Sequence, residues 1–119
     1  MEPPKIKVLG IAPYEAMKNV MEKLARKRPQ MEMDVYVGDL KKGVDIAQKN
    51  IQGNYDVIIS RGGTAEMIGK VTHIPVIEIS LSVYDILRAM KLAENYSDKY
   101  AVVGFPSITS SAHLLCDLL

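Results

Sequence analysis

The stretch Asp56-Val57-Ile58-Ile59-Ser60-Arg61-Gly62-Gly63-Thr64 decides the fold. A short β-branched apolar run ends in a glycine turn, and the residues after the turn have helical periodicity. The same order of strand, turn and helix recurs along the chain, which is typical of a parallel α/β sheet. The predicted strands are Lys5 to Ile11, Met31 to Val37, Asp56 to Ser60, Ile74 to Ile79 and Lys99 to Phe105.

Helices are expected between and after these strands. The first lies between Pro13 and Pro29, on an apolar stripe that assigns Tyr14 to the core. The second is expected to begin at an Asp39 cap and to end before Gly53, which occupies the favoured position after a helix. The other three are expected at Thr64 to Val71, after a Ser82 cap, and at Ser107 to Leu119.

The second strand is the expected edge of the sheet. Met31 to Val37 alternates apolar and polar residues, whereas the other strands are nearly continuous apolar runs suited to burial on both faces. An edge at this place favours the flavodoxin-like strand order 2-1-3-4-5. The sequence therefore predicts a Rossmann-like or flavodoxin-like three-layer sandwich, a parallel sheet of four to five strands with helices on both faces.

Length and composition exclude several classes of protein. A chain of 119 residues with a net charge of +1 is expected to form a single domain with its own core. One cysteine and two histidines supply neither a disulfide nor a metal site, so no metal or cofactor is expected. The near-zero charge argues against direct nucleic-acid contact by this segment. No apolar run approaches the roughly 20 residues of a membrane span, and the expected localisation is cytoplasmic.

The loops after the strands hold the candidate site, because ligands of such sheets bind beyond the carboxyl ends of the strands. After the third strand, two glycines expose backbone N–H groups at a helix start, Arg61 adds a forked cation, and Ser60 and Thr64 add hydroxyls. These groups together suit a carboxylate or phosphate. A second interpretation stays open, in which the glycines only form a turn and Thr64 caps the helix. The candidate ligand-binding residues are Ala12, Ser60, Arg61, Gly62, Gly63, Thr64, Glu78, Ser80, Ser82 and Ser107.

Glu78 interrupts an apolar run. A carboxylate there is costly to bury unless it is hydrogen-bonded or partly solvated. It is therefore expected to face the ligand or to pair with Arg61 or Arg88.

Catalytic motifs are not found. A receiver domain needs acidic residues after strand one, where Ile11 and Ala12 stand, and an Asp ending strand three, where Ser60 stands. The sequence contains no phosphate-binding P-loop, dinucleotide fingerprint or nucleophile elbow. The residues thus indicate an anion-binding α/β domain with no evident catalytic apparatus.

Three stretches carry a resemblance to a known family. Ile58 to Ala65, Ile74 to Ile79 and Tyr84 to Ala89 resemble the N-terminal sensor domain of propionate-catabolism activators, the PrpR type of enhancer-dependent, sigma-54-type bacterial transcription regulators. The resemblance runs through nearly the whole chain. It implies a cytosolic module, not an enzyme, that senses a small organic acid of the 2-methylcitrate class.

The resemblance also implies partners and a domain arrangement. In the whole regulator an AAA+ ATPase and a DNA-binding domain follow the sensor, and the regulator acts on sigma-factor RNA polymerase as a homodimer or higher oligomer. Residues 1–119 would form the first of two lobes and the start of the second, to which the strand Lys99 to Phe105 could belong. This segment would contact neither nucleic acid nor membrane.

Two other functions stay open. One is a small α/β enzyme acting on a carboxylated or phosphorylated metabolite, with Arg61 holding the substrate. The other is a dimerisation module that senses nothing and pairs through the edge strand Met31 to Val37 or the helix Ser107 to Leu119.

Overall fold

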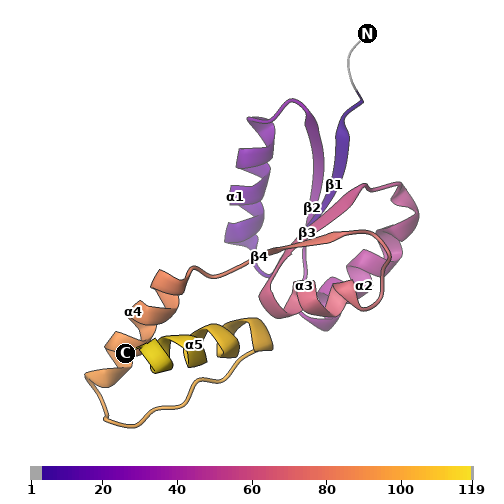
Figure 1. Cartoon of the computed structure of the whole chain (residues 1–119). Coiled ribbons are helices and arrows are strands. Elements are labelled where there is room, and N and C mark those ends of the chain that lie inside the picture. The colour runs from indigo at the N-terminus through magenta and orange to yellow at the C-terminus, as the bar shows by residue number, and fades with distance from the viewer. Residues whose placement is uncertain (1–3, 119) are drawn as a thin grey trace. The chain divides into compact units, whose positions relative to one another are not determined.

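A computed structural model describes residues 4–118 and divides the chain into two compact units, Met1–Ile79 and Ser80–Leu119 (Figure 1). The first unit contains β1 (Ile6–Ala12), α1 (Glu15–Arg26), β2 (Met31–Val37), α2 (Lys41–Asn50), the 3-10 turn η1 (Ile51–Gly53), β3 (Val57–Arg61), α3 (Gly62–Gly69) and β4 (Val76–Ile79). The second contains α4 (Val83–Glu94) and α5 (Pro106–Leu118). No helix among residues 4–118 is long and apolar enough to cross a membrane.

The first unit is built on one parallel sheet with the strand order β2-β1-β3-β4. β1 lies at the centre and pairs in parallel with β2 on one side and β3 on the other, and β4 pairs with β3. In β2 the apolar residues are partly buried and their polar neighbours are exposed up to Tyr36, as expected for an edge strand. The predicted α/β class, the strand order of the first four strands and the edge position are confirmed.

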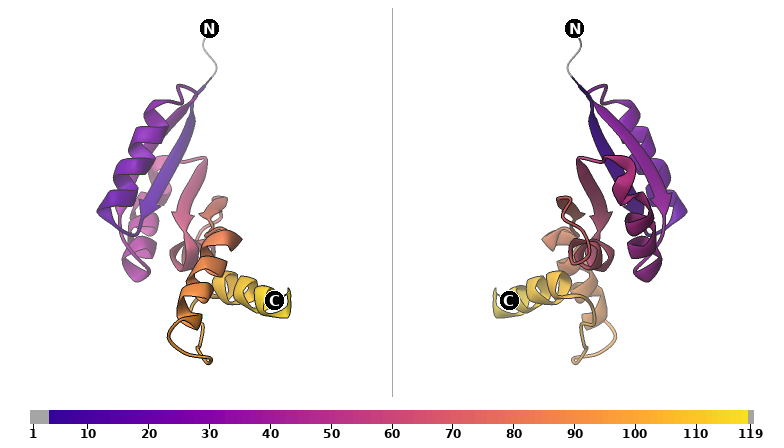
Figure 2. Two further views of the ribbon diagram at one scale, coloured as in Figure 1. Left: turned by 90° about the vertical axis from the view of Figure 1, so that its left-hand side faces the viewer. Right: turned by 90° about the vertical axis from the view of Figure 1, so that its right-hand side faces the viewer.

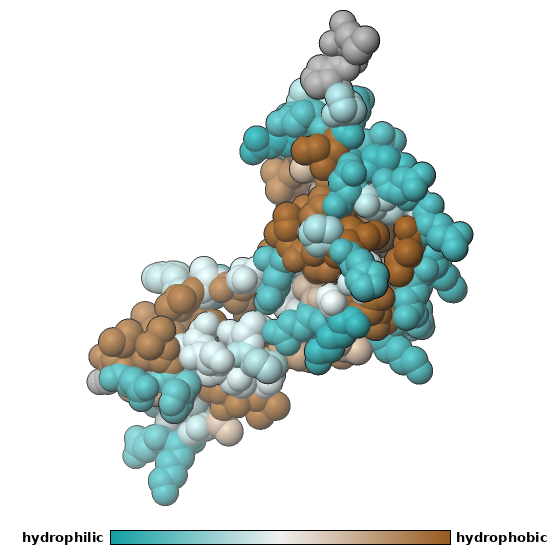
Figure 3. All heavy atoms as spheres, turned by 45° about the vertical axis from the view of Figure 1, so that its right-hand side comes forward, coloured by the Kyte–Doolittle hydropathy of each residue, from teal (hydrophilic) through white to brown (hydrophobic). Residues whose placement is uncertain are grey.

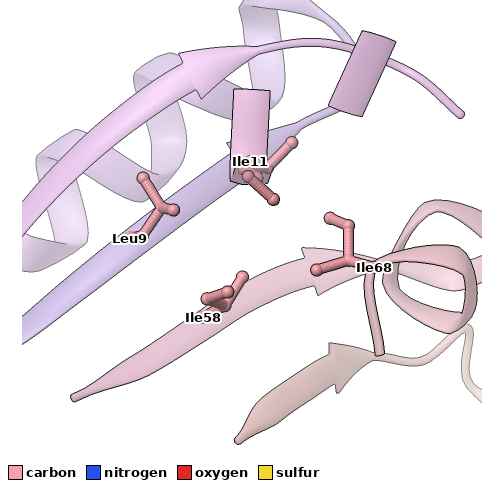
Figure 4. Packing of buried hydrophobic residues seen from close by; sticks show 5 residues of the cluster. Leu9, Ile11, Ile58 and Ile68 are labelled. Carbon is pink, nitrogen blue, oxygen red and sulfur yellow. The ribbon is translucent and has the colours of Figure 1, made fainter. Parts of the chain in front are cut away.

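Helices cover both faces of this sheet (Figures 1 and 2). On one face, Leu9, Ile11 and Ile58 pack with Ile68 of α3 and Ala47 of α2, and all five side chains are fully buried (Figure 4). The other face carries α1. There, a Cβ atom on Gly10 would lie 2.9 Å from Cε of Met21, so the absence of a side chain at Gly10 lets this helix approach the central strand closely.

The predicted fifth strand is wrong. Residues 99–105 form no strand and have no ladder partner among the described residues. The run has strand-like composition, yet Val103 is 92% exposed. A β-strand forms only where a neighbouring strand takes its backbone hydrogen bonds, and the second unit consists of two helices.

The second unit is a pair of helices with a small core. Ile86 and Met90 of α4 pack against Ala112 and Leu115 of α5. The start of α4 agrees with the sequence prediction, since the Ser82 side chain caps the helix by accepting from the Asp85 N–H at 3.1 Å. Figure 3 shows hydrophobic residues on the surface of this unit. Its exposed large side chains include Leu92, Tyr96, Val103, Leu114 and Leu118.

Two expected helix signals are wrong in detail. α2 has Leu40, not Asp39, as its N-cap, and no side chain caps it. After α2 the chain continues through η1, and the left-handed residue is Asn54 rather than Gly53. Asparagine tolerates this conformation better than most side chains, so it can replace glycine here.

Candidate functional site

The candidate site lies at the carboxyl edge of the sheet in the first unit. β1 and β3 are neighbours in parallel, so the residues that end them, Ala12 and Arg61, lie at the same edge. Ala12 is fully buried, and its carbonyl accepts a hydrogen bond from the N–H of Gly38 at 2.8 Å. Ala12 therefore ties the ends of β1 and β2 together.

The glycine pair after β3 opens a helix. α3 begins at Gly62, two residues earlier than predicted, with Arg61 as its N-cap. Gly62 has φ +51°, which a side chain would strain, although no atom lies within 4 Å of the position a Cβ would take. Its backbone conformation, rather than crowding, requires glycine. Both glycines thus lie in the first turn of α3, where backbone N–H groups have no partner inside the helix.

Arg61 is held by Tyr14, a residue that the sequence analysis assigned to the core. That assignment is wrong, because Tyr14 precedes the first residue of α1 and is 49% exposed. Nη1 of Arg61 donates to the Tyr14 hydroxyl at 3.0 Å. The sequence does indicate the true position of Tyr14. This residue directly follows Pro13 and therefore lies in the loop after β1, before the helix begins.

Among residues 4–118 Arg61 has no carboxylate partner. Within the described residues the ion pairs at 4.0 Å or less are Lys18–Glu22, Lys91–Glu94 and His113–Asp117. Glu78 is partly buried and enters none of them, so its expected pairing with Arg61 is wrong. Among residues 4–118 the guanidinium of Arg61, the residue directly before α3, therefore has no carboxylate to compensate its positive charge.

The hydroxyls of Ser60 and Thr64 do not serve as free donors. Ser60 is fully buried, and its hydroxyl donates to the carbonyl of Ile11 at 2.8 Å, which joins β3 to β1. Thr64 is 1% exposed, and its hydroxyl donates to Oδ1 of Asp39 at 3.0 Å. Both hydroxyl protons are used inside the fold, contrary to the prediction that these groups contribute donors to a ligand.

Thr64 lies at the centre of a clasp between α2 and α3, formed by Thr64, Asp39, Leu40 and Gly43. Besides donating to Asp39, the Thr64 oxygen accepts from the N–H of Leu40 at 2.9 Å. Leu40 has φ 48° and ψ −117°, an unusual conformation for a residue with a side chain. A Cβ on Gly43 would collide with Cγ2 of Thr64 and lie 3.0 Å from the carbonyl oxygen of Gly38. The clasp thus fixes the first turn of α3 against the start of α2.

The remaining predicted site residues belong to the second unit. Ser80 is exposed. Ser82 is engaged as the cap of α4, and its hydroxyl also donates to Oδ2 of Asp85 at 2.9 Å. Ser107 lies in the first turn of α5, and its hydroxyl oxygen is buried without a hydrogen-bond partner among the described residues.

Tyr55, a residue with a strongly shifted pKa, lies away from the carboxyl edge. The hydroxyl of Tyr55, just before β3, donates to Oδ2 of Asp34 at 2.7 Å. Desolvation first, and then this hydrogen bond to Asp34, raise the pKa of Tyr55 well above its ordinary value. The Lys7 ammonium lies 5.3 Å from the ring centroid and donates to the carbonyl of Gly53, so the group joins β1, β2 and the approach to β3. Within residues 4–118 no three His, Cys, Asp or Glu side chains gather as a metal site would require.

Comparison with known proteins gives two matches. The sequence model of a family described as "Propionate catabolism activator" matches residues 27–119. A solved structure of an NtrC family transcriptional regulator from Clostridium acetobutylicum is similar, with a TM-score of 0.64 and 27% sequence identity over 89% of this chain. The match covers 59% of that regulator's chain, so this chain spans about three fifths of its length. No match was found among curated proteins.

Proposed function

From the premise that this chain belongs to the propionate catabolism activator family, we propose that it senses a small organic acid anion at the carboxyl edge of its sheet. Family membership makes it a regulatory domain of transcription activators and not an enzyme. The observation that carries the proposal is the guanidinium of Arg61, which has no carboxylate partner among residues 4–118. Arg61 directly precedes Gly62 and Gly63 in the first turn of α3.

The chemistry of this edge suits a carboxylate. The N–H groups of the first turn of α3 lie at the positive end of the helix dipole, which favours a negative charge. A guanidinium can hold a carboxylate with two parallel hydrogen bonds. Because one N–H of Arg61 donates to Tyr14, the side chain is oriented, while its other N–H groups donate to no group among residues 4–118. We extend the proposal to tricarboxylates of the 2-methylcitrate class on the strength of the family.

Regulation follows as a shift between two states. The effector can move the equilibrium between an active and a restrained regulator only by its difference in affinity for the two. The proposal includes an attached AAA+ ATPase and DNA-binding domain, with sigma-factor RNA polymerase as the final partner. It also includes a cytoplasmic location and a homodimeric or higher assembly. Sedimentation over a range of concentrations tests the assembly, and a constant monomer mass would refute it.

The domain arrangement is proposed in the same way. We take Met1–Ile79 as a first lobe and Ser80–Leu119 as the start of a second. The reading frame of the gene tests this arrangement, and a stop codon directly after Leu119 would refute it.

A binding experiment tests the sensor itself. Thermal unfolding is followed with citrate, 2-methylcitrate, other di- and tricarboxylates and sugar phosphates. A ligand present at 100 times its dissociation constant stabilises the folded state by about 2.7 kcal/mol, which shifts the midpoint measurably. Arg61→Ala is expected to weaken binding about 10- to 100-fold, because it removes a charge-assisted hydrogen bond.

Arg26→Ala is the matched control. Arg26 is exposed in the last turn of α1, where its Nε donates to the carbonyl of Glu22, so its loss leaves the carboxyl edge unchanged. Equal weakening by the two variants would show a non-specific charge effect and refute the site. If no acid shifts the midpoint while the mass rises with concentration, the dimerisation module is the better interpretation.

A further inference from the structure

Tyr14 connects two loops that are distant in sequence. It follows β1 and precedes α1, and its hydroxyl oxygen lies 3.0 Å from Nη1 of Arg61, 47 residues further along the chain. Its side chain is 49% exposed, so the contact lies at the surface of the carboxyl edge rather than in the core.

The direction of this hydrogen bond leaves one proton free. A guanidinium has only donors, so in this pair the Tyr14 oxygen must accept. The phenol keeps its own O–H, and no protein group among residues 4–118 accepts a hydrogen bond from it. Arg61 thus fixes the oxygen while the proton remains available to an acceptor from outside the chain.

The group that contacts this hydroxyl is itself a donor. It is the guanidinium of Arg61, and the residue after Arg61 begins the first turn of α3, whose N–H groups have no partner inside the helix. A cluster of donors with one uncompensated positive charge selects a ligand that offers several acceptor oxygens and a negative charge. A carboxylate satisfies both needs.

We propose that Tyr14 is a ligand-binding residue that donates its hydroxyl proton to the carboxylate held by Arg61. The inference rests on the proposed function and adds a second, uncharged recognition group to the site. It assigns the ligand class as polycarboxylates whose bound carboxylate takes hydrogen bonds from a guanidinium and a phenol together.

The test uses citrate as the probe and the 119-residue chain. Tyr14→Phe keeps the ring and removes only the hydroxyl, so thermal stability without ligand should stay unchanged while citrate binding weakens roughly tenfold. Tyr96→Phe is the matched control, because Tyr96 is 90% exposed in the second unit. The citrate affinity of Tyr96→Phe should equal that of the natural chain.

A double variant separates the role of Tyr14 from that of Arg61. If Arg61 orients the hydroxyl, Tyr14→Phe should cost much less affinity in the Arg61→Ala background than in the natural chain. If Tyr14→Phe lowers the citrate affinity equally in both backgrounds, the claim that Arg61 orients the Tyr14 hydroxyl is wrong.

The two proposals fail in different ways. If Arg61→Ala weakens citrate binding and Tyr14→Phe does not, the inference about Tyr14 is wrong and the sensor site stands. If the natural chain shows no citrate binding by calorimetry at millimolar ligand, the carboxylate site is wrong and the inference falls with it.

Discussion

Replacement of Gly43 by alanine tests the clasp between α2 and α3. Gly43 lies inside α2, where alanine normally stabilises a helix by roughly 1 kcal/mol relative to glycine. Here the added methyl group would collide with Cγ2 of Thr64 and crowd the carbonyl oxygen of Gly38 at 3.0 Å. We therefore expect the opposite sign, a loss of stability.

The size of the loss follows from the contacts. Overpacking a filled site costs about 1–3 kcal/mol. Movement of Thr64 would also weaken its hydrogen bonds to Asp39 and Leu40, each worth about 0.5–1.5 kcal/mol. After the helix gain is subtracted, Gly43→Ala should lower the free energy of unfolding by roughly 1–3 kcal/mol.

Urea unfolding followed by circular dichroism measures this change. Gly69→Ala is the matched control, because Gly69 ends α3 and no atom lies within 4 Å of its absent Cβ. This variant should be as stable as the natural chain or more stable, by up to about 1 kcal/mol. Thr64→Ser removes the colliding methyl and keeps the hydroxyl, so Gly43→Ala should cost much less in that background. A stabilised Gly43→Ala, or an equal cost in both backgrounds, would refute the reasoning.

Three further predictions concern single side chains. Because the pKa of Tyr55 is raised in the folded state, its neutral hydroxyl stabilises the fold fully below pH 10.0, the ordinary tyrosine pKa, and this stabilisation is lost as the pH rises beyond it. The urea midpoint of Tyr55→Phe should therefore fall less steeply above pH 10.0 than that of the natural chain. Parallel curves of midpoint against pH would contradict this. Ser60→Ala removes the buried donor to Ile11 and should cost about 1 kcal/mol in urea unfolding, whereas an unchanged midpoint would show that this bond adds nothing. Ser82→Ala removes the cap of α4 and should cost about 1 kcal/mol of helix stability, seen as faster amide exchange in the first turn of α4 but not in the sheet.

The sequence predicts well those elements whose causes are local. Apolar alternation identified β2 as an edge strand, and Ser82 followed by Asp85 identified the start of α4. The glycines of the third loop correctly indicated a strand-to-helix turn, because the cause, a positive φ at Gly62, is a property of that residue alone. In each case a few neighbouring residues contain the whole physical reason.

The errors have non-local causes. The local sequence around Asp39 suggests a helix cap, but its carboxylate accepts from Thr64, 25 residues away. Tyr14 fits an apolar helix stripe, and although Pro13 places it in the loop before α1, its partner Arg61 lies 47 residues away and no local pattern could indicate that contact. Residues 99–105 have the composition of a strand, and their structure depends on whether another strand lies beside them, which no local pattern records.

All four strands of the sheet lie within the first 79 residues, and this has a consequence for biosynthesis. The central strand β1 is translated before both of its neighbours, and all four strands are translated before any residue of the second unit. Translation of Ser80–Leu119 takes roughly 2–8 s at 5–20 residues per second. Mixed α/β domains fold within milliseconds to about a second, so the sheet can form as soon as its last strand has left the ribosome. The order of the strands along the chain thereby lets the carboxyl edge, with Arg61 and Tyr14 in place, form ahead of the rest of the chain.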